Sequence, residues 1–147
     1  MQAFLGFRST IVSDGRFFAP IGDARVSVVD VRDIAAVAVA ALTEGAHHGK
    51  TYDIAGPEAP THAEIAAQLS EALGKEITFV NVPEMAMRDG LLRFGFPEWQ
   101  ADGLVEDYAH YRRGEASAIS TAVQDVTGVA PHTFRTFARD YADAFLR

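Results

Sequence analysis

The amino-acid sequence predicts an α/β fold, in which a few mostly parallel strands alternate with crossover helices and a helical cap follows. Two observations lead to this class. Between residues 16 and 82 the hydrophobic period switches repeatedly between two residues, typical of strands, and about 3.6 residues, typical of helices. From residue 84 onward only the helical period remains. Strands that alternate with helices pair in parallel, because each return needs a crossover connection.

The first half of the chain contains five predicted elements, separated by glycine, proline and other turn residues. Residues 2–11 are expected to form a short helix, and residues 16–19 a short extended segment. Residues 25–29 alternate between apolar and polar side chains, which predicts a strand. Residues 33–42 repeat apolar side chains at helical spacing. Residues 51–55 then predict the next strand.

The second half begins with a specific local signal. Thr61 and Glu64 have the spacing of a capping box, which predicts a helix start at this point. Gly74 is the expected stop of that helix, and residues 77–82 predict another strand. The remaining helices are expected over 84–94, 97–113, 121–127 and 134–146. The last of them presents one apolar face that we expect in the core: Phe134, Phe137, Ala138, Tyr141 and Phe145.

Length and composition exclude several classes of protein. The chain has 147 residues, and we expect residues 1–147 to form a single unit. A net charge of -7 argues against broad nucleic-acid binding, which needs a positive surface. No apolar run approaches the ~18 residues of a membrane helix, and no secretory signal pattern is visible. Cysteine is absent, so we expect a cytoplasmic protein without disulfides and without membrane or nucleic-acid partners.

Motifs of a self-contained nucleotide enzyme are missing from the sequence. It has no G-x-G-x-x-G and no P-loop, and the turn at residues 28–32 contains no glycine. No tyrosine has a lysine four residues later, and no G-x-S-x-G occurs. We therefore predict no catalytic residue, no cofactor-binding residue and no metal ligand. His47 and His48 are expected in a solvated loop, and His62 and His132 at the surface.

Two groups of residues allow more than one interpretation. The run Asp30-Val31-Arg32-Asp33 is either a ligand-binding carboxylate and guanidinium at the carboxyl end of a strand or a helix cap with a local ion pair, and we favour the cap. Aromatic residues either line an apolar pocket or fill the core. The residues in question are Phe17, Phe18, Phe94, Phe96, Trp99, Tyr108 and Tyr111.

Four segments carry a resemblance to a known family: Ala24–Ala35, Lys50–Glu58 with the Thr61 capping segment after it, Phe96–Trp99, and the ending Thr127–Asp140. In their order and spacing they resemble the NmrA-like family of atypical short-chain dehydrogenase/reductases. The resemblance runs over essentially the whole chain but covers only the C-terminal half of that family. It implies the C-terminal part of a Rossmann-like fold with a helical cap on the substrate side.

Members of this family are NAD(P)H-dependent reductases, or redox-sensing regulators that bind NADP without turnover. Their first half carries the glycine-rich loop. The resemblance therefore implies NADP or NAD for a full-length relative and no cofactor for this chain alone. Met1–Leu5 resembles a segment that members place near the nicotinamide and the substrate, although Ala3 stands where members often have asparagine.

We accordingly predict the substrate-pocket half of an oxidoreductase, which is not expected to bind cofactor or catalyse alone; the sequence leaves open whether the chain is an enzyme. Its substrate would be small and apolar or aromatic, in a pocket shaped by Phe4, Phe17, Phe18 and Trp99. One alternative is a stand-alone ligand- or protein-binding module, whose homo-oligomer covers the faces that the missing half would cover. Another is a fragment of a non-catalytic NADP-sensing regulator.

Overall fold

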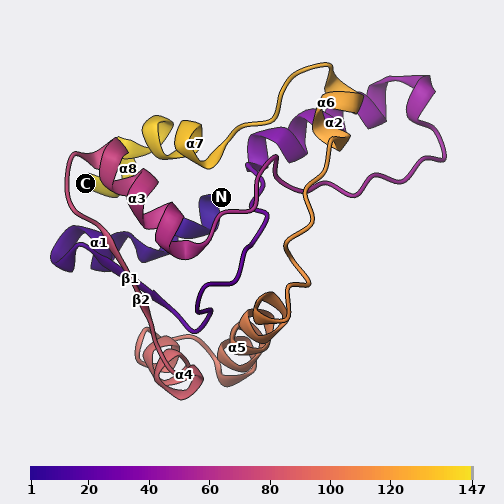
Figure 1. Ribbon diagram of the computed structural model, residues 1–147. Helices are drawn as coiled ribbons and strands as arrows, with labels where there is room; N and C mark the ends of the chain where they lie inside the picture. The colour runs from indigo at the N-terminus through magenta and orange to yellow at the C-terminus, as the bar shows by residue number, and fades with distance from the viewer. Residues whose placement is uncertain (147) are drawn as a thin grey trace.

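A computed structural model describes residues 1–146 of the chain (Figure 1). In chain order the elements are the 3-10 helix η1 (Gln2–Phe7), α1 (Arg8–Asp14), β1 (Arg16–Ala19), α2 (Val31–Thr43), the 3-10 helix η2 (Gly45–His47), α3 (His62–Leu73), β2 (Thr78–Asn81), α4 (Glu84–Arg93), α5 (Glu98–Arg112), α6 (Ala122–Thr127), α7 (Phe134–Asp140) and α8 (Ala142–Leu146). The strands with α1, α3, α7 and α8 form the main body. The helices α2 and α6 form a second group, and α4 and α5 a third.

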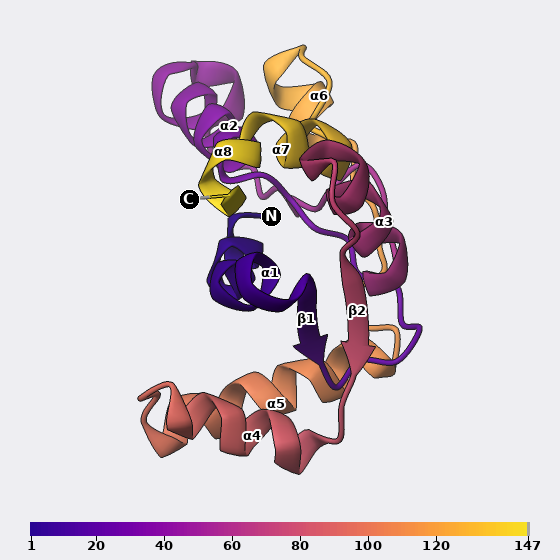
Figure 2. The same ribbon diagram turned by 90° about the vertical axis from the view of Figure 1, so that its left-hand side faces the viewer.

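The sheet within residues 1–146 consists of β1 and β2, which pair in parallel with Arg16 opposite Thr78 and Ala19 opposite Asn81. Both arrowheads point toward the α4–α5 pair (Figure 2). Gly15 precedes β1 with a φ of 65°, and a Cβ atom there would lie 2.8 Å from the carbonyl oxygen of Glu76, so only glycine fits. The predicted extended segment at 16–19 and the predicted strand at 77–82 are confirmed as β1 and β2. The α/β class is confirmed too, in a mostly helical form.

The two other predicted strands are wrong for this chain. Residues 25–29 contribute only an isolated antiparallel bridge between Arg25 and Thr61, and residues 51–55 form no regular secondary structure. Both segments keep the alternating pattern of a strand. A strand, however, is defined by hydrogen bonds to a neighbour, and no neighbouring strand lies beside them in the part of the chain that the structure describes.

Helix ends follow the sequence signals closely. Thr61 and Glu64 form the reciprocal capping box, and Gly74 ends α3 in the left-handed conformation with a φ of 61°. The predicted helix at 2–11 is instead η1 followed by α1, which extends to Asp14. The predicted helix at 134–146 is interrupted at Tyr141, whose φ of -104° leaves the helical range. Its ring lies 4.8 Å from that of Phe137, four residues earlier, and under the guanidinium of Arg32.

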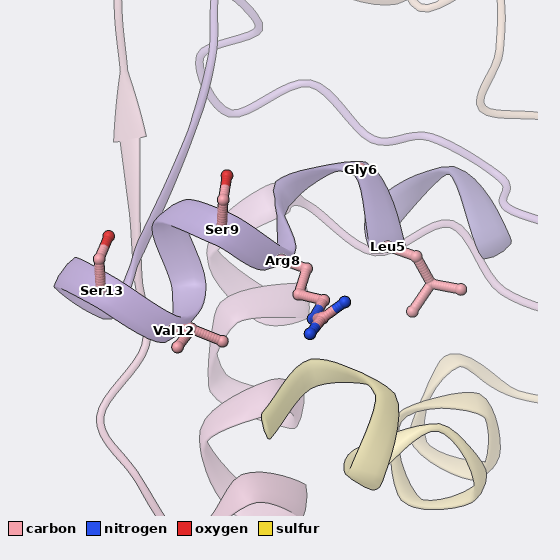
Figure 3. A pocket seen from close by; sticks show the side chains of 6 residues that line it. All are labelled: Leu5, Gly6, Arg8, Ser9, Val12 and Ser13. Atoms are coloured by element: carbon pink, nitrogen blue, oxygen red, sulfur yellow. The ribbon is translucent and has the colours of Figure 1, made fainter. Parts of the chain in front are cut away.

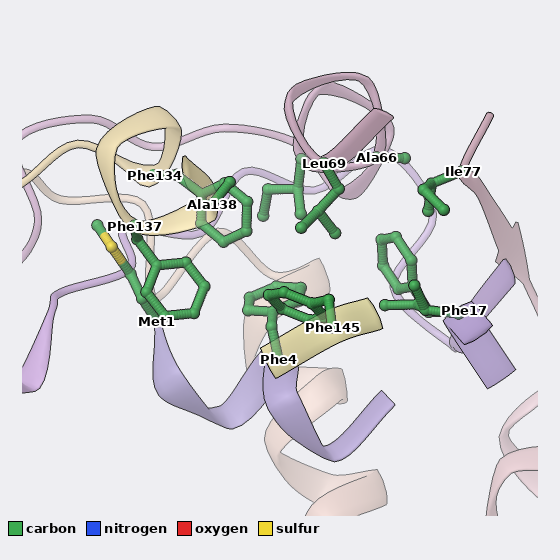
Figure 4. Packing of buried hydrophobic residues seen from close by; sticks show 12 residues of the cluster. Met1, Phe4, Phe17, Ala66, Leu69, Ile77, Phe134, Phe137, Ala138 and Phe145 are labelled. Carbon is green, nitrogen blue, oxygen red and sulfur yellow. The ribbon is translucent and has the colours of Figure 1, made fainter. Parts of the chain in front are cut away.

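Most of the apolar side chains gather in one cluster, which we call the main core (Figure 4). The helices η1, α1, α3, α7 and α8 supply it together with β1. The predicted core face of the last helical segment is confirmed, because Phe134, Phe137, Ala138 and Phe145 are fully buried and Tyr141 packs against them. The main core consists of Met1, Phe4, Ile11, Phe17, Ile65, Ala66, Leu69, Ile77, Phe134, Phe137, Ala138 and Phe145.

The α4–α5 pair lies at the carboxyl ends of both strands, away from the main core (Figure 2). No residue of α4 is buried, and Ala101 is the one buried residue of α5. Met85, Phe94 and Trp99 on or between these helices are largely exposed. The pair is therefore a cap held mainly by its own helix–helix contact and by its attachment to the strand ends.

Candidate functional site

The structure brings two of the four predicted substrate residues together inside the main core. Phe4 is 6% exposed and Phe17 is 0% exposed, and their ring centroids lie 5.9 Å apart in an edge-to-face arrangement. Phe17 also contacts the rings of Phe7 and Phe79 at 5.5 Å. Both side chains therefore pack against other residues of this chain and form a rigid aromatic layer.

The other two predicted substrate residues lie on different surfaces. Phe18 follows Phe17 in β1, so its side chain points to the opposite face of the sheet, where it is half-buried. Trp99 lies in the first turn of α5 and is 76% exposed. These two rings are accessible from outside the chain, whereas Phe4 and Phe17 lie beneath the surface.

A hollow of about 280 Å³ lies at the carboxyl ends of β1 and β2, the position at which open α/β sheets bind their ligands. Its polar groups already have partners. The side-chain oxygen of Asn81 accepts a hydrogen bond from the Gly22 amide at 2.8 Å. Arg112 donates to the carbonyl of Pro20 and pairs with Glu84, so it ties α5 to the strand end and to α4.

The C-terminal half of α5 packs two tyrosines against the cluster of Ala19, Ile21 and Val26. Tyr108 and Tyr111 have ring centroids 5.8 Å apart at an interplanar angle of 87°, and both pack near the loop that follows β1. Burial, followed by the charges of Tyr111 and Asp107, raises the pKa of Tyr108 to about 12. The phenol is therefore protonated at neutral pH and can act as a hydrogen-bond donor but not as a base.

A second, larger hollow of about 430 Å³ runs along η1 and α1 (Figure 3). Leu5 and Arg8 project from one side of the helix, and Ser9 and Ser13 from the other. Arg8 is the charged group among the lining residues. The hollow adjoins the segment Met1–Leu5, and its mixed lining would accept a polar or anionic group beside an apolar one.

Asp30 fixes the position of that N-terminal segment. Its carboxylate is 0% exposed and accepts hydrogen bonds from the Gln2 side chain at 2.8 Å and from the backbone N–H and the guanidinium of Arg32. Gln2 in turn accepts from the Val31 amide at 3.0 Å. Burial works to raise the pKa of Asp30, but the hydrogen bonds from Arg32 and Gln2 outweigh it and hold that pKa well below its usual value. The favoured interpretation of Asp30, a helix cap with a local ion pair, is confirmed.

Asp33 and His132 form a contact that the sequence did not predict. The Asp33 carboxylate is almost fully buried and lies 2.6 Å from the Nδ1 atom of His132 and 2.9 Å from its backbone N–H. The pair joins the first turn of α2 to the segment before α7. The two residues are 99 positions apart, and no local pattern in the sequence relates them.

His62 is the clearest error among the predicted positions. It was expected at the surface, but it is 4% exposed and lies among the rings of Phe4, Phe17 and Phe79 at 5.3–5.9 Å. Its Nδ1 atom is buried and has no hydrogen-bond partner within residues 1–146. A signal was present, because His62 begins the stripe that Ile65 continues at i+3 along α3. Burial lowers the pKa of His62 to about 4, so the ring is neutral at pH 7.

We expect the buried His62 to make the chain less stable in mild acid. The unfolded chain protonates this histidine near pH 6.5, whereas the folded chain does so only near pH 4, so the unfolded state binds the extra proton between these values. The free energy of unfolding should therefore fall by about 2 kcal/mol from pH 7.5 to pH 5 on account of this residue. Urea unfolding of the wild type and of His62→Leu measures it, because the variant should lack this part of the pH dependence. Equal pH dependence in both proteins would contradict the prediction.

The helix N-termini do not suit a phosphate group. In α2 the Asp30 carboxylate accepts the backbone N–H of Arg32, and in α3 Thr61 and Glu64 close the first turn. The helices α4 and α5 begin with Glu84 and Glu98. Each helix of ten or more residues in the described chain thus carries a carboxylate in its first turn, which repels an anion there. The residues present do not fit the pyrophosphate of a dinucleotide.

Residues 1–146 contain neither a candidate metal cluster nor a helix suited to cross a membrane. Histidine, aspartate and glutamate side chains do not gather there in a group of three or more that could hold a metal ion. Among the described helices, none is both long and apolar enough to cross a membrane.

His47, which was expected in a solvated loop, lies in η2 with its Nδ1 atom 2.7 Å from the Tyr52 hydroxyl.

Comparison with known proteins shows similarity to reductases. No family model matches the sequence. The NAD(P)H azoreductase of Xenophilus azovorans is 38% identical to this chain over 145 residues, which are 99% of this chain and 51% of that protein. The chain thus spans about half the length of the curated relatives that it matches.

Solved structures give the same relationship. An NADPH-dependent quinone oxidoreductase of Escherichia coli superposes with a TM-score of 0.85 at 26% identity, over 95% of this chain and 50% of that one. The triphenylmethane reductase of Citrobacter sp., solved in complex with NADP(H), superposes with a TM-score of 0.82 at 28% identity, over 94% of this chain and 48% of that one.

Proposed function

Because this chain corresponds in sequence and fold to the C-terminal half of NmrA-like, NAD(P)H-dependent reductases, we propose that it forms the substrate side of such an oxidoreductase. Residues 1–147 act as one unit, and the other half of a full-length protein binds the NADP or NAD. The observation that carries the proposal is the match over 99% of this chain to half of a reductase. The proposed location is the cytoplasm, which suits a chain without cysteine.

The proposed substrate is a small apolar or aromatic electron acceptor. Phe18 and Trp99 are the accessible aromatic residues of the predicted set, and such rings stack favourably on flat aromatic compounds. Phe4 and Phe17 lie in the packed aromatic layer of the main core and support the position of β1 and η1. The named relatives act on azo compounds, quinones and triphenylmethane dyes, which are acceptors of this kind.

In this proposal the bound NAD(P)H supplies a hydride, and the residues of this chain do the positioning. The α4–α5 pair at the strand ends shields the acceptor from water. Phe18 and Trp99 lie on different surfaces of this chain, and each is proposed to contact a different part of the acceptor.

The isolated chain is expected to show no binding of NADPH at micromolar concentration, because its helix N-termini are closed by its own carboxylates. Isothermal titration of the 147-residue chain with NADPH measures this. Micromolar binding of NADPH by the chain alone would contradict the proposal that the other half of a full-length protein binds the cofactor.

A chimaera tests the substrate side. In it, this chain replaces the matching half of the Xenophilus azovorans azoreductase, and we expect NADPH-dependent reduction of a quinone. Trp99→Ala and Phe18→Ala should each lower kcat/KM by about 3- to 10-fold, the loss of one aromatic contact. Val129→Ala, at a site 66% exposed on another surface, is the matched control and should change nothing. Full activity in both aromatic variants would argue against this assignment.

A second candidate function is a stand-alone binding module that self-associates as a homo-oligomer. The exposed apolar side of α2, with Leu42 85% exposed, favours it. Sedimentation velocity at tens of micromolar distinguishes the two, since a clean monomer argues against the module. If the chain is instead a fragment of an NADP-sensing regulator, the chimaera should bind NADPH without reducing a quinone.

A further inference from the structure

His62 lies in an apolar compartment formed by aromatic rings from three other elements. Its imidazole is 4% exposed, and the ring centroid lies 5.5 Å from that of Phe4 in η1, 5.9 Å from that of Phe17 in β1 and 5.3 Å from that of Phe79 in β2. The rings meet the imidazole at tilted angles of 44–61°. At this residue the first turn of α3 therefore packs against η1 and against both strands.

The compartment does not suit a charged imidazole. The Nδ1 atom of His62 is buried and has no hydrogen-bond partner within residues 1–146. In the charged ring both nitrogens carry a proton, so Nδ1 would become a buried donor without an acceptor there. Ring faces attract a cation, but burial penalises the charge more strongly, since the pKa of His62 falls to about 4.

The charged groups of the surrounding elements do not offset this penalty. Burial lowers the pKa of His62 without a contribution from a neighbouring charge. Neither η1 nor β2 contains an ionisable side chain. The α-ammonium of Met1, before η1, donates to the Val29 carbonyl, and Glu58, before α3, accepts from the Phe134 amide. The charged side chains of β1, α3 and α7 are all exposed: Arg16, Glu64, Glu71, Arg135, Arg139 and Asp140.

Of the elements around His62, η1 has the weakest attachment. It is a 3-10 helix of six residues, and hydrogen bonds in such helices have poorer geometry than those of an α-helix. Gln2 at its start is bound by Asp30, but every later side chain of η1 is apolar or absent, so packing holds them. By contrast, β1 and β2 pair with each other, and α3 is a 12-residue helix with a capping box.

We infer that His62 is an acid-sensitive latch for η1: the neutral ring holds η1 on the main body, and its protonation releases Phe4–Phe7 while the rest of the chain stays folded. The charged ring reaches water only if one wall of the compartment moves away, and η1 is the wall that costs least to move. The latch operates within this chain, so its test requires neither a second half nor a substrate.

Amide hydrogen exchange of the 147-residue chain tests the latch. Rates are expressed as protection factors, so that the intrinsic pH dependence of exchange cancels. The released ring has the ordinary pKa of 6.5 and the enclosed ring a pKa of about 4, so the ratio of released to closed η1 should rise about 25-fold from pH 7.5 to pH 5. The protection factors of residues 4–8 should fall by the same factor. Low concentrations of urea should not change this loss, because a local opening exposes little surface.

Two variants and a matched control assign the effect to His62. His62→Leu and His62→Phe fill the compartment with a side chain that cannot be charged. The loss of protection in residues 4–8 between pH 7.5 and pH 5 should be about 25-fold smaller in both variants than in the wild type. His48→Leu removes an exposed histidine instead and should keep the wild-type loss.

A loss of protection that is equal in the wild type and in the His62 variants overturns the inference. A loss that grows with urea and is shared by β1 also overturns it, because the acid effect is then global unfolding. If neither His62 variant folds, the wild type decides alone. A urea-independent loss confined to η1 then supports the latch, and protection factors that stay the same between pH 7.5 and pH 5 contradict it.

Discussion

Phe17→Ala is expected to lower the free energy of unfolding by about 3–5 kcal/mol, the usual cost of removing a fully buried aromatic ring. Phe17 is 0% exposed and contacts the rings of Phe4, Phe7 and Phe79. The small β1–β2 sheet offers few neighbours that could collapse into the space left behind. Urea unfolding, followed by far-ultraviolet circular dichroism, measures the loss.

Phe18→Ala is the matched control for this prediction, because the adjacent side chain points to the other face of β1 and is half-buried. Its cost in stability should be about 1 kcal/mol. If Phe17→Ala does not fold, Phe17→Leu keeps most of the volume and should cost less than the alanine variant. Equal losses in the free energy of unfolding for Phe17→Ala and Phe18→Ala would contradict the difference in burial between these two side chains.

Asp30→Ala is expected to cost about 3 kcal/mol or more, because it removes the acceptor of several hydrogen bonds and leaves the Arg32 guanidinium without its buried partner. The bond from Gln2 is lost as well, so the N-terminal segment should loosen. Amide exchange in residues 2–7 should therefore increase along with the global loss of stability.

Two controls separate the charge of Asp30 from its capping role. Asp30→Asn retains an N-cap acceptor and should cost less than Asp30→Ala. Arg135→Ala breaks an exposed pair with Glu71 and should change stability by no more than about 1 kcal/mol. A similar loss in Asp30→Ala and Arg135→Ala would contradict the importance of the buried carboxylate.

The lowered pKa of Asp30 also gives the sign of a pH effect. The carboxylate is charged in the folded chain at pH values at which the unfolded chain, with an ordinary pKa of 3.8, already takes up a proton. Its stabilisation is therefore complete above that range and declines as the pH falls through the lower, folded pKa. The effect of His62 sets in at higher pH, so the two residues can be separated in one titration.

Local signals predicted the helix boundaries well, because a cap depends on residues three or four positions apart. The Thr61–Glu64 capping box and the stop at Gly74 are confirmed. Asp30 as an N-cap is confirmed for the same reason. The apolar face of residues 134–146 correctly predicted burial, although it did not predict the interruption at Tyr141.

Candidate site residues were less accessible to sequence reasoning. An aromatic residue in a strand is equally compatible with the core and with a pocket until the facing elements are known. Phe17 and Phe18 illustrate this, because they are adjacent in sequence and lie on opposite faces of β1. The contact between Asp33 and His132 joins positions 99 residues apart. Hydrophobic periodicity carries no information about contacts between residues so far apart in sequence.

The sequence by itself determined the α/β class, the helix signals at Asp30, Thr61 and Gly74, the extended segments at 16–19 and 77–82, and the resemblance to one half of a reductase. These features depend on local spacing and composition, which can be read from the sequence without knowledge of its tertiary contacts. Tertiary structure alone decided that residues 25–29 and 51–55 join no strand within residues 1–146, that His62 is buried, and that the outer side of α2 is exposed there. The physical reason is that strand pairing and burial each depend on two surfaces in contact. The sequence pattern of a segment describes only one of these two surfaces.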